Sequence, residues 1–174
     1  MGRLSWVLAA FVVAVLTTAD AAPRQQAALD RYKAVFLYHF IGYVTWPDVE
    51  AGSDFRIGVL GNSEVTASLQ KLVQTRSAGD RKLLVRTYGR LEDVAPCELL
   101  FVTTTFADSS RAIAARMDPH HTLTVTDAPS APALVIRFLR VDDQLKFTVD
   151  LAALERAGLK ASAHLLRLAI DTDS

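Results

Sequence analysis

The stretch Tyr32–Pro47 reads Tyr-Lys-Ala-Val-Phe-Leu-Tyr-His-Phe-Ile-Gly-Tyr-Val-Thr-Trp-Pro and contains the densest group of aromatic residues in the chain. At about 100° per residue, this order predicts a helix with two apolar stripes. The first stripe is Ala34, Leu37, Ile41 and Val44, and the second is Phe36, Phe40 and Tyr43. A helix with two apolar stripes needs two partners, namely the rest of its own domain and a second protein surface. Pro47 predicts that the helix ends near Trp46.

The same stretch supplies candidate residues for a protein–protein contact. Core packing accounts for Phe36 and Phe40, whereas Tyr38 lies on the less apolar side of the helix. A tyrosine there suits an interface because its ring is apolar and its tip is polar. The predicted partner-binding residues are Tyr32, Tyr38, His39, Tyr43 and Trp46.

The composition of the chain indicates one globular domain and argues against nucleic-acid binding. The chain has 174 residues, of which 51% are hydrophobic, enough for a substantial core. Lys plus Arg and Asp plus Glu both number 19, so the formal net charge is zero. The composition therefore argues against a broad basic field that would hold a nucleic acid, and leaves a local basic patch as the alternative.

The first residues are typical of an export signal. Arg3 is followed by an apolar run, Leu4–Leu16, and by the small-x-small pattern Ala19-Asp20-Ala21. The alternative is a membrane anchor, but a membrane-spanning helix needs about 20 apolar residues, which exceeds this run. The predicted organisation is a signal peptide at 1–21, a flexible lead-in at 22–30, one domain at 31–170 and a tail at 171–174. No later segment is apolar enough to be predicted as a membrane span.

The chain has a single cysteine, Cys97, which cannot close a disulfide within one chain. It precedes an apolar run, so we interpret it as a small buried residue at the start of a strand. An intermolecular disulfide and a reactive thiol are the alternatives.

The pattern of apolar runs and turn residues predicts an α/β fold. Strands are expected at Phe55–Leu60, Lys82–Tyr88, Cys97–Val102 and Thr122–Thr126, with helices beginning near Ser63 and near Ser109 or Ser110. The alternating segments Leu134–Val141 and Leu145–Val149 predict a β-hairpin with its turn at Asp142-Asp143. Asp150 and Ser162 are placed to cap two closing helices, the second with Leu165, Leu168 and Ala169 on its inner face. The predicted architecture is a three-layer sandwich with a mainly parallel sheet, a C-terminal antiparallel hairpin and closing helices.

Two strand ends are candidates for ligand contacts. Gly61-Asn62-Ser63 and Thr103 follow predicted strands, where open α/β sheets expose free backbone N–H groups. A tight turn is the alternative, because neither a Gly-x-Gly-x-x-Gly fingerprint nor a P-loop occurs here. The four histidines have no ligand at helical spacing, and no catalytic motif stands out. We therefore predict no catalytic residues, no metal site and no cofactor.

Four blocks of the sequence resemble the YfiR-like periplasmic proteins. They are Lys33–Phe40 with Val44–Pro47, then Phe55–Gly61, then Cys97–Val102, and finally Phe147–Leu151 with Ala157–Ser162 and Leu165–Ala169. The resemblance implies a small, often dimeric α/β protein of the periplasm without established catalysis. Its best-understood members bind and repress the periplasmic part of an inner-membrane diguanylate cyclase, which lowers cyclic di-GMP. Disulfides are thought to hold or tune that repressor.

The chain departs from the family pattern at three places. Ala131–Ile136 replaces a Gly-Gly-Met-Ile type motif, and the preceding loop, Asp127–Pro132, is short, so the role of that loop is left open. With Cys97 alone, sensing through an intramolecular disulfide does not carry over. Asp150 replaces a family Asn and retains the ability to cap.

These observations predict a periplasmic, non-enzymatic regulator that binds the sensor part of a membrane signalling protein and does not itself span the membrane. A homodimer is a further option for the aromatic helix. The alternative function is a small-ligand binding protein that uses the turns near Gly61 and Thr103. A hydrolase with a dispersed site is the third hypothesis.

Overall fold

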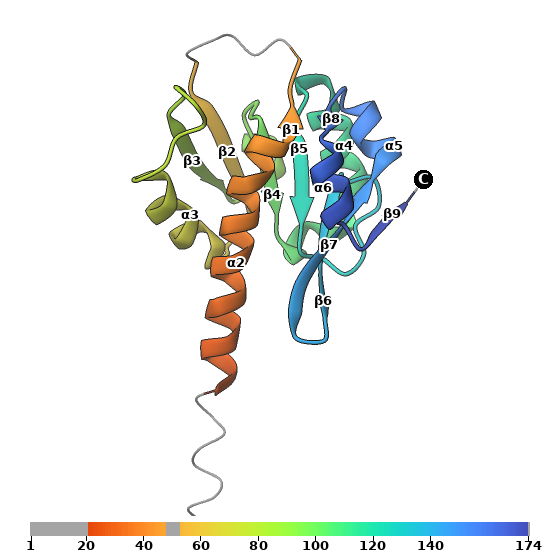
Figure 1. Cartoon of the computed structure of the whole chain (residues 1–174). Helices are drawn as coiled ribbons and strands as arrows, with labels where there is room; N and C mark the ends of the chain where they lie inside the picture. Colours follow the sequence, from red (N-terminus) through yellow and green to blue (C-terminus); the bar gives the residue numbers. More distant parts are fainter. Residues whose placement is uncertain (1–20, 48–52, 174) are drawn as a thin grey trace, which may run out of the picture.

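The computed structural model describes residues 21–47 and 53–173. One seven-stranded sheet lies between two layers of helices (Figure 1). Its strands are β2 (Phe55–Leu60), β3 (Leu83–Tyr88), β4 (Leu99–Val102), β5 (Leu123–Thr126), β6 (Ile136–Val141), β7 (Gln144–Asp150) and β9 (Asp171–Asp173). The helices are α2 (Ala21–Tyr43), α3 (Val65–Val73), α4 (Ser110–Met117), α5 (Leu151–Arg156) and α6 (Ala163–Leu168). Short 3-10 helices cover Leu91–Asp93, Thr104–Ser109 and Asp118–His120.

The sheet confirms the predicted mainly parallel arrangement with an antiparallel C-terminal hairpin. Its strand order is β3-β2-β4-β5-β6-β7-β9, and β3, β2, β4, β5 and β6 pair in parallel. Strand β7 returns antiparallel to β6 through the turn at Asp142-Asp143. Both turn residues have positive φ, 48° and 60°, which fits the twist of a two-residue hairpin.

The two faces of the sheet have separate cores. Apolar residues of β2, β4, β5, β6 and β7 on one face pack against α2 and α3, and Phe101 and Phe147 are fully buried there. On the other face, Leu100 and Val102 pack against Ile113 and Met117 of α4. The helices therefore stabilise the sheet from both sides, as expected for a parallel sheet.

Helix α2 supplies the centre of the larger core. Ala34, Leu37 and Phe40 are buried, each at most 1% exposed, and Val44 follows in a short strand, β1 (Val44–Thr45). Strand β1 pairs with β8 (Lys160–Ala161) and so joins the end of α2 to the C-terminal part of the chain. Ile41, expected in the main apolar stripe, is only half-buried, because Phe40 fills the position facing the sheet.

Three parts of the chain differ from the prediction. Residues 22–30, predicted as a flexible lead-in, belong to α2, which begins at Ala21, and Asp30 accepts hydrogen bonds from Gln26 and Lys33 within this helix. Residues 171–173 form β9, which pairs in parallel with β7, instead of a frayed tail. Leu168 is 48% exposed, so α6 turns this leucine outward, and Leu165 alone is fully buried on that helix. The predicted signal peptide lies outside the described residues, apart from its last position, Ala21.

Candidate partner-binding face

The outward side of α2 and the adjoining part of α6 form an exposed apolar surface, which we call the α2–α6 face. It consists of Tyr32, Val35, Phe36, His39 and Tyr43 of α2 with His164 and Leu168 of α6. Tyr32 is 60% exposed, Val35 40% and Leu168 48%. Residues three and four apart on a helix are neighbours, so the α2 members form one continuous stripe. Large apolar side chains left this exposed in one stripe are typical of an interaction site.

A hollow of about 110 Å³ lies within this face. Its lining is Phe36, His39, Phe40, Tyr43, Phe147, Leu165 and Leu168. On the other flank of α2, a wider hollow of about 410 Å³ is lined by Tyr38, His39, Gly42, Arg76 and their neighbours. His39 lines both hollows and therefore lies between them. A partner that binds here can contact both sides of the His39 ring.

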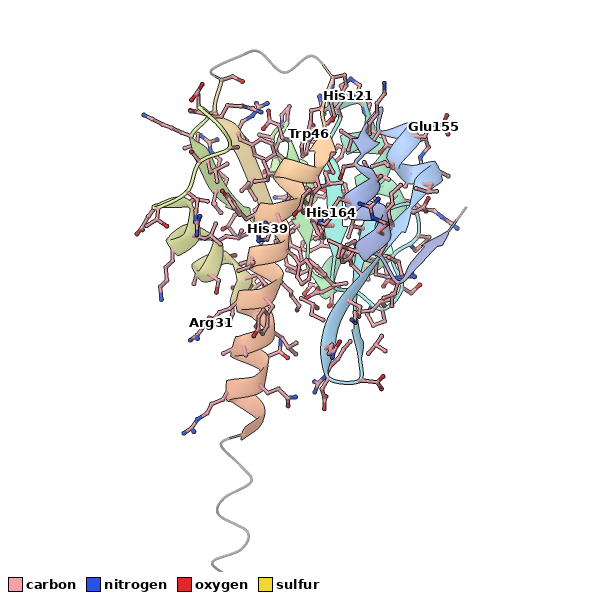
Figure 2. All side chains as sticks on the ribbon, viewed as in Figure 1. Arg31, His39, Trp46, His121, Glu155 and His164 are labelled. Atoms are coloured by element: carbon pink, nitrogen blue, oxygen red, sulfur yellow. The ribbon has the colours of Figure 1, made fainter. Side chains whose placement is uncertain are left out.

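Aromatic contacts fix the two helices of the face against each other. The ring of Tyr43 lies 4.9 Å from that of His164 and stacks with His39 at 6.3 Å, centroid to centroid. The backbone N–H of Ser162 donates to the carbonyl of Tyr43 at 2.8 Å. Figure 2 shows His39 and His164 on the neighbouring helices that these contacts join. His39, Tyr43 and His164 are therefore held in place before a partner binds, which reduces the side-chain entropy that these three residues lose on binding.

Of the five predicted partner residues, Tyr32, His39 and Tyr43 lie on the α2–α6 face, Tyr38 lies on the other flank of α2, and Trp46 follows the end of the helix. Tyr38 is half-buried and its hydroxyl donates to the carbonyl of Ser77 at 3.2 Å. Trp46 packs edge-on against Phe55 at 5.1 Å, and its Nε1–H donates to the carbonyl of Glu98 at 3.0 Å. The polar tip of Trp46 is thus used within the fold.

Glu98 organises the end of the sheet below Trp46. Arg56 donates to both carboxylate oxygens of Glu98, at 2.9 and 3.2 Å, and its backbone N–H donates at 2.7 Å. Arg81 lies 3.6 Å from the same carboxylate and covers the ring of Phe55. Burial opposes the charge of Glu98, but the hydrogen bonds from Arg56 outweigh it and lower the pKa of Glu98. Glu98 therefore stays charged and serves the fold.

The strand-end turns named as ligand candidates satisfy their own polar groups. The Thr103 hydroxyl donates to the carbonyl of Leu60 at 3.0 Å, and a Cβ at Gly61 would lie 2.0 Å from that hydroxyl oxygen. Ser63 Oγ accepts from the N–H of Val65 at 3.2 Å, and Asn62 is exposed beside it. Gly61 has φ of +100°, so a glycine is needed here for the turn and for close approach.

The chain matches the family model described as YfiR/HmsC-like over residues 30–170. That span covers most of the chain and every strand from β1 to β8. The chain belongs to the YfiR/HmsC-like family.

A solved structure of similar fold adds to this result. It is described as a conserved domain protein from Vibrio cholerae O1 biovar El Tor str. N16961, with a TM-score of 0.54 and 15% sequence identity. The match covers 83% of this chain and 60% of that chain. At this identity the likeness extends to the fold alone. No curated protein matches the chain.

In this YfiR/HmsC-like chain, the described residues contain no helix that is both long and apolar enough to cross a bilayer. Over residues 21–47 and 53–173, no group of three or more His, Cys, Asp and Glu side chains is placed to hold a metal ion. His121 has its Nδ1 2.8 Å from the carbonyl of Ala157 and joins α5 to the sheet.

Sequence reasoning missed four members of the face, namely Val35, Phe36, His164 and Leu168. Phe36 and Leu168 were interpreted as core residues, because large apolar side chains at helical spacing usually face the core. The signal available for Val35 was its position between Tyr32 and His39, both already named. Leu168 gave no such signal, because the orientation of a six-residue helix depends on tertiary contacts.

Proposed function

We propose that this protein is a periplasmic, non-enzymatic regulator that binds the periplasmic sensor part of an inner-membrane signalling protein, such as a diguanylate cyclase, and represses it. The export signal in the sequence and membership of the YfiR/HmsC-like family support this proposal. The exposed apolar surface of the α2–α6 face is the structural observation that supports partner binding.

The face has the composition of a protein-binding site. Its core is aromatic and aliphatic, and it contains no carboxylate or ammonium group. Depletion of charge with enrichment in aromatic residues is the compositional signal of interface cores. The hollow near Leu168 is the size of one apolar side chain, so we expect an apolar anchor of the partner to enter it.

The binding step can be tested with two matched valine variants. Val35 on α2 and Val141 at the end of β6 are both 40% exposed, but only Val35 belongs to the face. The mature chain, its Val35→Asp variant and its Val141→Asp variant would each be used to capture the detergent-solubilised cyclase encoded nearest to this chain. We expect Val35→Asp to weaken capture by about tenfold or more, since burying an unpaired carboxylate costs more than 1.4 kcal/mol.

The Val141→Asp variant should capture the membrane protein as well as the unmodified chain. Equal capture by all three proteins would refute the α2–α6 face as the binding site. Failure of the unmodified chain to capture this cyclase would refute the proposed function. Thermal unfolding of both variants verifies that each remains folded.

A further inference from the structure

A second surface of interest lies on the opposite face of the sheet, where β3 is the edge strand. In the register of the parallel pair, Arg56 lies opposite Leu84, Gly58 opposite Arg86, and Leu60 opposite Tyr88. Paired residues point to the same face. These side chains therefore lie on the face away from α2 and α3.

This part of the sheet has no helix over it. Helix α4 packs on Leu100 and Val102 and reaches Leu60, but Leu84 remains 41% exposed and Arg86 is also exposed. Gly58 contributes no side chain, and the ring of Tyr88 leans toward it, with Cε2 3.3 Å from the place of a Cβ. The result is a hollow of about 240 Å³. It is lined by Arg56, Ile57, Gly58, Leu84, Arg86, Tyr88, Ala95, Pro96 and Cys97.

The lining combines an apolar floor with unused hydrogen-bond donors. Among the described residues, the Arg86 guanidinium and the Tyr88 hydroxyl have no hydrogen bond or ion pair to the protein. Arg56 adds a second guanidinium, shared with Glu98, and the lining contains no carboxylate. The potential in the hollow is therefore positive, while Gly58, Leu84 and Pro96 supply apolar contact.

We propose that this hollow binds a small organic carboxylate with a compact apolar body. The carboxylate lies at Arg86 and the Tyr88 hydroxyl, where charge-assisted hydrogen bonds are available. The apolar body lies over Gly58 against the Tyr88 ring, Leu84 and Pro96. This pairing of a few polar groups with an apolar floor is the usual construction of small-molecule sites.

The thiol of Cys97 forms part of the floor and takes no chemical role. Burial and the neighbouring Glu98 raise the pKa of Cys97 to about 12, so the sulfur is a neutral thiol near neutral pH. The site therefore binds its ligand without covalent chemistry. It lies on the sheet face opposite the α2–α6 face and is independent of the proposed regulatory function.

The test uses phenylacetate, phenylacetamide and acetate as probes, with calorimetry and the side-chain NMR signals of arginine as readouts. We expect saturable binding of phenylacetate at millimolar concentration or below, with a shift of the Arg86 signal. Phenylacetamide has the same shape without the charge, and acetate has the charge without the apolar body. Each should bind at least about tenfold more weakly, phenylacetamide because it loses a charge-assisted contact and acetate because it buries almost no apolar surface.

Two variants locate the site. Arg86→Gln should weaken phenylacetate binding by about tenfold, and Tyr88→Phe by a few fold, since each removes one donor. Arg111→Gln is the matched control, because Arg111 is also exposed and makes no hydrogen bond or ion pair with the described residues, but lies on α4 outside the hollow. It should bind phenylacetate as the unmodified protein does.

Three results would overturn the proposal. These are no saturable phenylacetate binding, equal binding of phenylacetate and its amide or acetate, and binding that Arg86→Gln leaves unchanged. In the last case Arg86 would serve only to discourage strand pairing at an exposed sheet edge. None of these results bears on capture of a membrane protein by the α2–α6 face, so the two proposals fail separately.

Discussion

Lys33 Nζ lies 2.7 Å from Asp127 Oδ2 and 3.2 Å from Asp30 Oδ1, so one ammonium group joins α2 to the residue that follows β5. Lys33 and Asp30 are buried, and Asp127 also accepts a hydrogen bond from the Thr104 hydroxyl at 3.2 Å. The ammonium separates two carboxylates that would otherwise repel each other. This contact adds a polar link between α2 and the end of β5 to the apolar packing of the helix.

Lys33→Met is expected to lower the free energy of unfolding by about 2–4 kcal/mol, because it leaves two poorly solvated carboxylates without a cation. Urea unfolding measures this change. Lys82→Met is the control, since Lys82 is exposed, and its effect should stay within about 0.5 kcal/mol. Equal stability of the two variants would contradict a structural role for the Lys33 contact.

Because folding lowers the pKa of Glu98, the free energy of unfolding should depend on pH. Its pKa is lowered in the folded protein, where burial acts against the shift and the Arg56 hydrogen bonds outweigh it. The charged form therefore stabilises the fold above the unfolded pKa of about 4.3, and this contribution is lost as the pH falls through the folded pKa. Glu98→Gln should be less stable than the unmodified protein at neutral pH, with a difference that shrinks below about pH 4. Urea unfolding across this range tests it, and a difference that does not vary with pH would exclude the mechanism.

Local sequence patterns predicted the elements of the sheet well. Asp150 accepts from the N–H of Ala153 at 2.7 Å, and Ser162 accepts from that of Leu165 at 3.2 Å, both as predicted helix caps. The strand Phe55–Leu60 has the predicted bounds. Such features depend on neighbouring residues only, since a cap acts over three residues and a buried strand is a continuous apolar run.

Long-range relationships were not available from the sequence. Lys33 and Asp127 are 94 positions apart, and neither has a neighbour in sequence that indicates the other. Strand β9 consists of polar residues and exists because β7 offers an open edge. The outward orientation of Leu168 likewise depends on where α2 and β7 lie. The helix at the centre of the fold was predicted, but the full extent of its exposed face was not.

The turn of the β6–β7 hairpin can be stabilised. Asp142 and Asp143 both have positive φ, which Asn and Gly adopt with less strain. We expect the double variant Asp142→Asn, Asp143→Gly to raise the free energy of unfolding by about 0.5–1 kcal/mol. The exposed ion pair between Arg140 and Asp143 is lost, which offsets part of this gain. Thermal unfolding should rank this variant above the unmodified protein and Asp142→Val, Asp143→Val below it; the reverse order would contradict the turn assignment.

Gly58 on β2 is close enough to Cys97 for an engineered disulfide. A Cβ at Gly58 would lie 3.3 Å from Cys97 Sγ and 2.8 Å from Leu100 Cδ1, the end of a flexible side chain that can move. Gly58→Cys should therefore form an intramolecular disulfide under oxidising conditions and stabilise the oxidised fold by about 2–4 kcal/mol, less the strain at Leu100. Thiol titration should find no free thiol in the oxidised variant, and thermal unfolding with and without reductant measures the gain in stability.

Gly42→Cys is the control, because nothing lies within 4 Å of its Cβ position. It should retain two titratable thiols once unfolded under non-reducing conditions. Two free thiols in oxidised Gly58→Cys would show that β2 and the segment before β4 are further apart than described.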